Sequence, residues 1–113
     1  MVERIDNELG DVLKALSDAS RRRIMTLLVQ EGAMTVGELA GRFDMSLAAV
    51  SKHIKVLEAA GLVSRRTEWR EHVISARMEP LQVVDRWLSG LRSNWAMRLE
   101  ILAKIMKEND NDD

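Results

Sequence analysis

A run of hydrogen-bonding and basic side chains between residues 46 and 55 has the chemistry needed to bind a nucleic acid. On a helix, Lys52 and Lys55 share one face with Ala48, and Ser51 lies on its flank. No acidic residue of this segment precedes Glu58. Hydroxyl and ammonium groups on such a small face can hydrogen bond to phosphates and to base edges in a DNA major groove. The alternative is an ordinary amphipathic helix whose lysines are solvated.

The helix that would position these side chains has a marked start and a marked end. Ser46 can cap its N-terminus, because the serine hydroxyl accepts a free backbone N–H of the first turn. Gly61 can end it, because glycine adopts the left-handed conformation without strain. Val50, Ile54 and Leu57 recur at helical spacing and predict an apolar inner face.

The preceding residues complete a helix-turn-helix, which we predict over residues 35–60. Thr35 and Glu38 have the spacing of a capping box, in which each side chain accepts a free backbone N–H of the other residue. A further helix is predicted over residues 19–31, with Asp18 as its N-cap. Two short helices joined by a tight turn, the second with a small polar outer face, are typical of a helix-turn-helix.

Residues 62–77 predict a β-hairpin directly after this motif, because helical spacing ends and β-branched residues appear. A hairpin in this place is the wing of a winged helix. Its Arg65, Arg66 and Arg70 could reach phosphates or a neighbouring minor groove. Trp69 at the tip is either an edge residue packed on its own strand or a DNA contact. The tip has no glycine, so the sequence leaves its turn type open.

His53 is the remaining candidate on the helix and lies at the edge of its inner face. A phosphate contact and a packed structural role are both consistent with that position. The residues predicted to bind DNA are Ser46, Leu47, Ala48, Ser51, Lys52, His53, Lys55, Arg65, Arg66 and Arg70.

The terminal helices, predicted over residues 6–16 and 81–107, carry apolar residues that we expect at a dimer interface. The last helix would be about 40 Å long at 1.5 Å per residue, longer than a domain of this size needs. A second copy of the chain is the simplest partner for its apolar stripe. The alternative is that the stripe covers the domain's own core, and we expect its first part to do so. The predicted interface comprises Leu9, Val12, Leu13, Val84, Trp87, Leu88, Leu91, Trp95, Leu99 and Leu102.

Together these segments predict one mainly α domain over residues 1–113, a winged helix-turn-helix of about five helices plus a two-stranded wing. The net charge is −1, but residues 42–77 hold seven basic and four acidic residues, so the basic excess lies in the predicted DNA-binding part. Residues 108–113 form an acidic tail that we expect to be solvated or frayed.

Composition narrows the classes of function further. The absence of cysteine excludes disulfides, thiolate metal sites and cysteine nucleophiles. No glycine-rich phosphate loop and no cluster of titratable residues on one element is present, so we expect no enzyme and no cofactor. With no apolar run long enough for a membrane span and no apolar signal core, we expect a soluble, cytoplasmic protein without a membrane partner.

Two motifs resemble the ArsR/SmtB family of bacterial winged-helix repressors. They are LSDASRRRI at residues 16–24 and SLAAVSKHIKVLEAAGLV at residues 46–63, and the resemblance spans roughly residues 8–106. It implies a homodimer, built on the first and last helices, that binds an imperfect palindrome in double-stranded DNA and represses a nearby operon. A small signal, such as an unidentified small-molecule effector, would then weaken DNA binding.

The family's metal sites lack their ligands in this sequence, so the chain resembles the subgroup without them. The positions of the family's thiolates fall at Thr35 and Gly37. The last helix keeps Asp85 and Glu100 but has no histidine, and a zinc site needs about four converging ligands. We therefore predict no metal. A metal-responsive repressor and a winged helix that contacts only proteins are the alternatives to a DNA-binding regulator.

Overall fold

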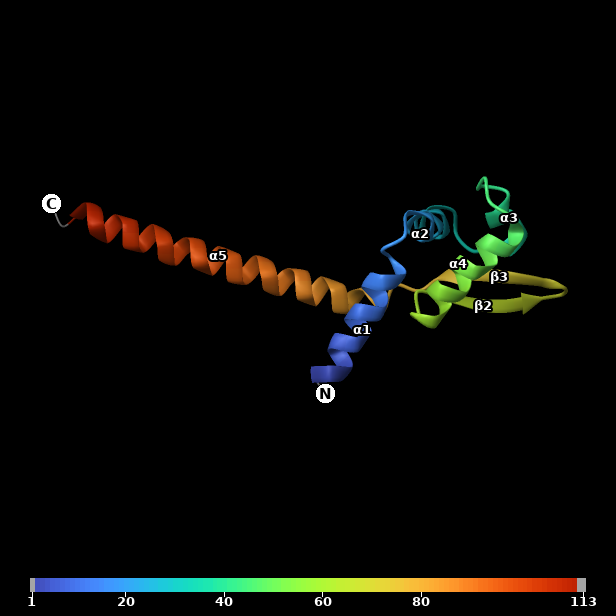
Figure 1. The fold of residues 1–113 in the computed structure, drawn as a ribbon, viewed down its shortest axis with the longest axis horizontal. Helices are drawn as coiled ribbons and strands as arrows, with labels where there is room; N and C mark the ends of the chain where they lie inside the picture. The colour runs from blue at the N-terminus through green and yellow to red at the C-terminus, as the bar shows by residue number, and fades with distance from the viewer. Residues whose placement is uncertain (1, 112–113) are drawn as a thin grey trace.

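The computed structural model describes residues 2–111, which form five helices and three short strands. The order is α1 (Val2–Ala15), α2 (Ala19–Glu31), β1 (Met34–Thr35), α3 (Val36–Ala40), α4 (Leu47–Ala59), β2 (Val63–Glu68), β3 (Glu71–Ala76) and α5 (Leu81–Asn111). The body holds α2, α3, α4 and the strands, while α5 leaves it in the direction opposite to the β2–β3 hairpin (Figure 1). The predicted mainly α winged helix-turn-helix is confirmed.

A third strand, β1, was not predicted. The sheet is antiparallel with the order β1-β3-β2, so β1 pairs with the second wing strand, Met34 opposite Ile74 and Thr35 opposite Val73. Two residues are too few to show an alternating pattern in the sequence. This pairing anchors the base of the wing to the start of α3.

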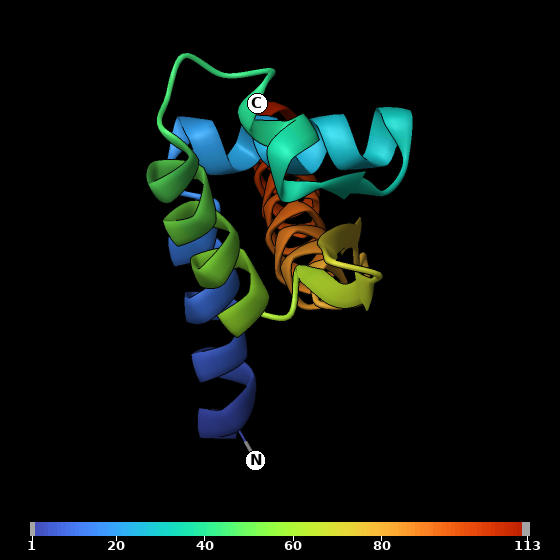
Figure 2. The ribbon, with the colours of Figure 1, turned by 90° about the vertical axis from the view of Figure 1, so that its right-hand side faces the viewer.

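The core lies where α2, α3, α4 and the sheet meet (Figure 2). Val50, Ile54 and Leu57 of α4 are fully buried, as their helical spacing predicts. Each side chain of this size contributes about 1.5–3 kcal/mol when fully buried. Other fully buried side chains come from the neighbouring elements: Ile24, Leu39, Leu62 and Ile74. The inner face of α4 is therefore fixed, and this sets which face points outward.

Local capping fixes the ends of α4. The Ser46 hydroxyl accepts the Ala49 N–H at 3.1 Å. At the other end Gly61 has a φ of 76°, its N–H donates to the Glu58 carbonyl, and the Leu62 N–H donates to the Leu57 carbonyl at 2.9 Å. This pair of bonds is a Schellman motif, so the predicted glycine end is confirmed.

The caps of α2 and α3 are also confirmed, with one difference. Asp18 accepts the Arg21 N–H at 3.0 Å, and Thr35 accepts the Glu38 N–H at 3.1 Å. The Glu38 carboxylate, however, accepts the Thr35 hydroxyl at 3.2 Å, where the capping box predicted the Thr35 backbone N–H. The Thr35 side chain therefore caps α3, whereas the Glu38 side chain bonds to the Thr35 hydroxyl and not to its backbone.

The terminal helices are longer than predicted. Helix α1 begins at Val2 where residue 6 was predicted, and α5 continues to Asn111, so residues 108–111 of the acidic tail are helical. Met1 and residues 112–113 of the predicted tail and domain lie outside the described residues. Within the described residues, no helix is both long enough and apolar enough to cross a membrane.

Only the first turn of α5 packs on the body. Leu81 and Val84 lie against the core, whereas every residue from Asp85 to Asp110 is exposed. At 31 residues α5 is about 46 Å long, and the molecule measures 78 × 33 × 20 Å. Most of the apolar stripe of α5 therefore covers nothing within one protomer.

Candidate DNA-binding surface

The outer face of α4 carries the side chains that the sequence assigned to DNA. Ala48, Lys52 and Lys55 are exposed, and Ser51 is half-buried. Leu47, in the first turn of the helix, is also exposed. Neither Lys52 nor Lys55 forms an ion pair with any described residue. Both ammonium groups are therefore available to a phosphate.

A groove of about 330 Å³ separates α4 from the wing and joins residues that are far apart in the sequence. Leu47 and Ser51 line it from α4, and Arg65 and Arg70 line it from the wing. Four of the predicted DNA-binding residues therefore surround one hollow. The remaining lining residues, which the sequence did not assign to DNA, are Thr35, Val36, Gly37, Glu71 and His72. The pairing of β1 with β3 brings them there, and nothing local in the sequence indicates it.

Two wing arginines are paired with acids. Arg65 Nε lies 3.5 Å from Glu58 Oε2 at the end of α4, and Arg66 Nε lies 3.0 Å from Glu68 Oε1 on the same strand. These pairs are partly exposed, so each contributes little to stability. A phosphate would compete with the carboxylates for both guanidinium groups.

The wing ends in a two-residue loop, Trp69–Arg70, between Glu68 and Glu71, which face each other as the last register pair. Trp69 has a φ of 60°, and its side chain is 87% exposed. The Arg70 guanidinium carbon lies 5.7 Å from the centroid of the Trp69 ring. The hypothesis that Trp69 packs on its own strand is therefore wrong, because the ring lies in solvent beside Arg70.

His53 lies apart from the other predicted DNA-binding residues, at the contact between α4 and α2. Its Nδ1 is 3.3 Å from Arg21 Nη1 and 3.9 Å from Asp18 Oδ2. The Arg21 guanidinium can only donate, so Nδ1 accepts this bond in the tautomer that carries its proton on Nε2. Of the two roles left open by the sequence, this geometry favours the packed structural one.

Arg21 has a structural role that the sequence did not indicate. Its Nε donates to the Ala15 carbonyl at 2.6 Å, and its Nη2 donates to the Lys14 carbonyl at 3.2 Å. Both carbonyls belong to the last turn of α1, which a cation stabilises, and the Lys14 carbonyl also accepts the Ser17 N–H and hydroxyl. The backbone N–H of Arg21 holds the pKa of the Asp18 carboxyl below its ordinary value, and the charge of a protonated His53 and that of the Arg21 guanidinium act in the same direction.

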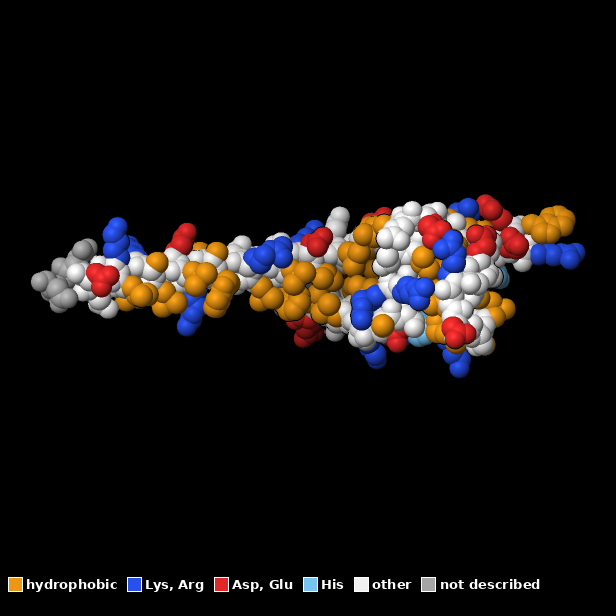
Figure 3. All heavy atoms as spheres, turned by 90° about the horizontal axis from the view of Figure 1, so that it is seen from above, with side chains coloured by type: hydrophobic (Ala, Val, Ile, Leu, Met, Phe, Trp, Pro, Cys, Tyr) orange, Lys and Arg blue, Asp and Glu red, His pale blue; other side chains and the backbone are white. Residues whose placement is uncertain are grey.

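Most of the predicted dimer residues are uncovered. The exposed ones from Trp87 onward form a hydrophobic band along α5 (Figure 3). Leu88, Trp95 and Leu102 are seven residues apart, the heptad spacing of paired helices. Leu13 is also exposed, and Leu9 and Val84 are half-buried. The prediction that Val12 lies at the dimer interface is corrected: its side chain is only 3% exposed within its own protomer, because α1 packs against the start of α5.

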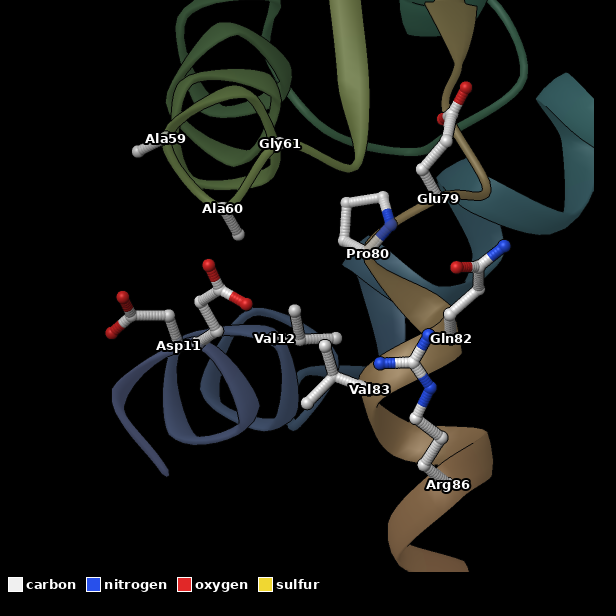
Figure 4. Close-up of a pocket in the computed structure, with 11 residues that line it drawn as sticks. Asp11, Val12, Ala59, Ala60, Gly61, Glu79, Pro80, Gln82, Val83 and Arg86 are labelled. Carbon is white, nitrogen blue, oxygen red and sulfur yellow. The ribbon is translucent and has the colours of Figure 1, made fainter. Parts of the chain in front are cut away.

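A second groove, of about 520 Å³, lies where α1, the end of α4 and the start of α5 meet. Figure 4 shows Val12 of α1 and Val83 of α5 next to each other, with Asp11 on the α1 side and Arg86 on the α5 side. Ala60 and Pro80 add further apolar lining.

Among residues 2–111, no three histidine or acidic side chains gather as metal ligands would.

The fold and this surface define a winged helix-turn-helix transcriptional regulator. Residues 16–66 match the family described as "Helix-turn-helix domain". The HTH-type transcriptional regulator Rv2034 of Mycobacterium tuberculosis is 47% identical over 103 residues, covering 88% of this chain and 89% of that protein. The transcriptional repressor SdpR of Bacillus subtilis is 32% identical over 80 residues, covering 71% of this chain and 88% of that protein.

Among solved structures, the ArsR-like transcriptional regulator from Rhodococcus sp. RHA1 is similar, with a TM-score of 0.75 and 33% sequence identity. The match covers 88% of this chain and 92% of that one. The chain belongs to the ArsR/SmtB-type family of helix-turn-helix transcriptional regulators.

Proposed function

We propose that the chain is a homodimeric repressor that binds an imperfect palindrome in promoter DNA, with α4 in the major groove. The groove between α4 and the wing carries this proposal, because Ser51, Arg65 and Arg70 meet around it. A helix in the major groove and a hairpin in the next minor groove straddle one phosphodiester strand, which fits a basic hollow between them. Lys52 and Lys55 of α4 add two cations that form no ion pair with a described residue.

The dimer is supported by the uncovered stripe of α5. Leu88, Trp95 and Leu102 are exposed and repeat at heptad spacing, so pairing with a second α5 would remove them from water. A two-fold axis along such a pair also repeats α4. The two α4 helices would lie about 34 Å apart to enter successive major grooves. An operator with two similar half-sites follows from that symmetry.

We expect the chain to repress transcription, because a dimer bound to a promoter excludes other proteins from the same DNA. SdpR, a relative of this chain, is named a repressor. A small-molecule effector stays a prediction, and the groove at Val12, Pro80 and Val83 is where we would look for it, since it joins α4 to the terminal helices. We expect a cytoplasmic protein without catalytic activity or cofactor.

The test is binding of the purified chain to the DNA upstream of its own gene, followed by fluorescence anisotropy at several salt concentrations. Log affinity should fall with log salt by about 0.9 for each phosphate contact. Lys52→Ala should lower both affinity and slope, whereas Lys107→Ala, the same charge change far along α5, should alter neither.

Binding to no DNA, even after selection from a random pool, would contradict the proposal. If the protein were still a dimer, that result would favour a winged helix that contacts only proteins. Binding whose affinity does not depend on salt would argue against phosphate contacts by the α4 and wing cations.

A further inference from the structure

The wing tip contains a tryptophan that contributes little to the stability of the protomer. Trp69 has a φ of 60°, which L residues with bulky side chains rarely adopt. In a two-residue hairpin loop, glycine or asparagine is favoured at such a position because neither meets this strain. The ring is also 87% exposed, so it gains no burial in return. The positive φ disfavours the folded protomer and burial of the ring does not offset this, so a partner that covers the ring would account for both features.

The location of Trp69 indicates which partner this is. The wing extends away from the body on the side opposite to α5, so the proposed dimer contact leaves the tip free (Figure 1). Arg70, the next residue, lines the groove shared with Ser51 of α4. Trp69 is therefore continuous with the proposed DNA-binding surface.

The chemistry of the tip fits a DNA minor groove. The Arg70 guanidinium lies over the Trp69 ring at 5.7 Å, which gives a flat apolar surface with a positive charge beside it. The minor groove is narrow, has apolar deoxyribose walls and attracts cations by its negative potential. Of the two acids that flank the loop, Glu68 is paired with Arg66 at 3.0 Å in the free protein.

We propose that Trp69 packs against the deoxyribose wall of the minor groove next to the α4 site, held in place by its strained loop and guided by Arg70. The proposal rests on the proposed function and adds a residue to it. Trp69 contributes affinity at the flanks of the operator, beyond the bases that α4 reaches.

The test compares wild type, Trp69→Ala and Trp69→Gly on a duplex selected from a random pool with the wild-type protein. Both variants should bind this duplex about fivefold more weakly, because they lose the apolar contact with the deoxyribose. On a duplex shortened at both ends to remove the flanking minor grooves, all three proteins should bind alike. In thermal unfolding, Trp69→Gly should melt a few degrees above Trp69→Ala, because only glycine relieves the strain.

Equal binding of all three proteins to the long duplex would overturn the inference and leave the proposed function intact. An equal loss on both duplexes would overturn it too, because the effect would then not lie at the flanks. Failure of the wild type to select any duplex would overturn the proposed function, and this inference with it. A Trp69→Ala variant that melts at or above Trp69→Gly would contradict the role of strain.

Discussion

Glu58 at the end of α4 holds Arg65 of the first wing strand, with Arg65 Nε 3.5 Å from Glu58 Oε2. Arg65 also lines the groove between α4 and the wing, so its side chain lies both beside Glu58 and at the proposed DNA-binding surface. The pair is partly exposed, at 25% for Arg65 and 39% for Glu58, and such pairs contribute about 0–1 kcal/mol to stability. In the free protein, Glu58 is therefore paired with the Arg65 guanidinium, which we expect to contact a DNA phosphate.

Glu58→Gln should tighten DNA binding by roughly threefold at low salt, because it removes a negative charge beside the phosphate strand and frees Arg65. The melting temperature should change little. Anisotropy titration measures the affinity, and Glu100→Gln on α5 is the control for the change in net charge. Weaker binding by Glu58→Gln would mean that the ion pair mainly positions the wing.

His53 and Lys52 are neighbours on α4 but should behave in opposite ways. His53→Ala removes the contact with Arg21 and should lower stability by about 1 kcal/mol, or several degrees in melting temperature. Lys52→Ala should leave the melting temperature unchanged and weaken DNA binding about fivefold. Calorimetry and anisotropy at 25 °C on both variants separate the effects. A stable His53→Ala variant with weakened DNA binding would make His53 a phosphate contact.

The helices and their caps were predictable because the rules behind them are local. Val50, Ile54 and Leu57 repeat with the period of a helix, and all three are fully buried. Ser46 and Gly61 act within one turn of their own positions, so their hydrogen bonds follow from the sequence alone. Because the buried face of α4 is known, the opposite face is known too, and Lys52 and Lys55 lie on it as predicted.

The features that the sequence did not predict depend on contacts between distant segments. Strand β1 is two residues long and exists only because β3 lies beside it. The use of Arg21 as a cap for α1 depends on the angle between α1 and α2, which no periodicity encodes. The groove that joins Ser51 to Arg70 likewise depends on how the wing folds back on α4. The sequence therefore identified individual residues of the site, but not how the fold arranges them around the groove.

Asp18 should make stability depend on pH in the acid range. Its pKa lies below the ordinary value of 3.8, because the charged form accepts the Arg21 N–H and lies near His53 and Arg21. A carboxyl with a lowered pKa stabilises the fold above 3.8 and loses that contribution as the pH falls through the folded-state value. Asp18→Asn keeps a capping oxygen but cannot titrate.

Thermal unfolding of both proteins between pH 2 and pH 7 measures this effect. The wild type should be the more stable protein at pH 6, and the difference between the two should shrink as the pH falls well below 3.8. Asp11→Asn on α1 is the control for loss of one carboxylate. A difference that stays constant across this range would mean that the charge of Asp18 contributes nothing.

Trp95 should be important for the proposed dimer, because it is the largest side chain of the heptad set and is 62% exposed in the protomer. A tryptophan at the centre of an interface commonly contributes 2 kcal/mol or more. Trp95→Ala should therefore weaken dimerisation at least about thirtyfold. Met97, also exposed, lies on the opposite face of α5, so Met97→Ala is a matched control for lost apolar surface.

Light scattering across a concentration series gives the dimer dissociation constants, and anisotropy gives DNA affinity for the same samples. Trp95→Ala should bind DNA weakly at concentrations where it is monomeric and recover as the dimer forms, because the operator engages two α4 helices together. Met97→Ala should follow the wild type in both measurements. A Trp95→Ala protein that is monomeric yet binds the same operator with full affinity would mean that one protomer is the DNA-binding unit.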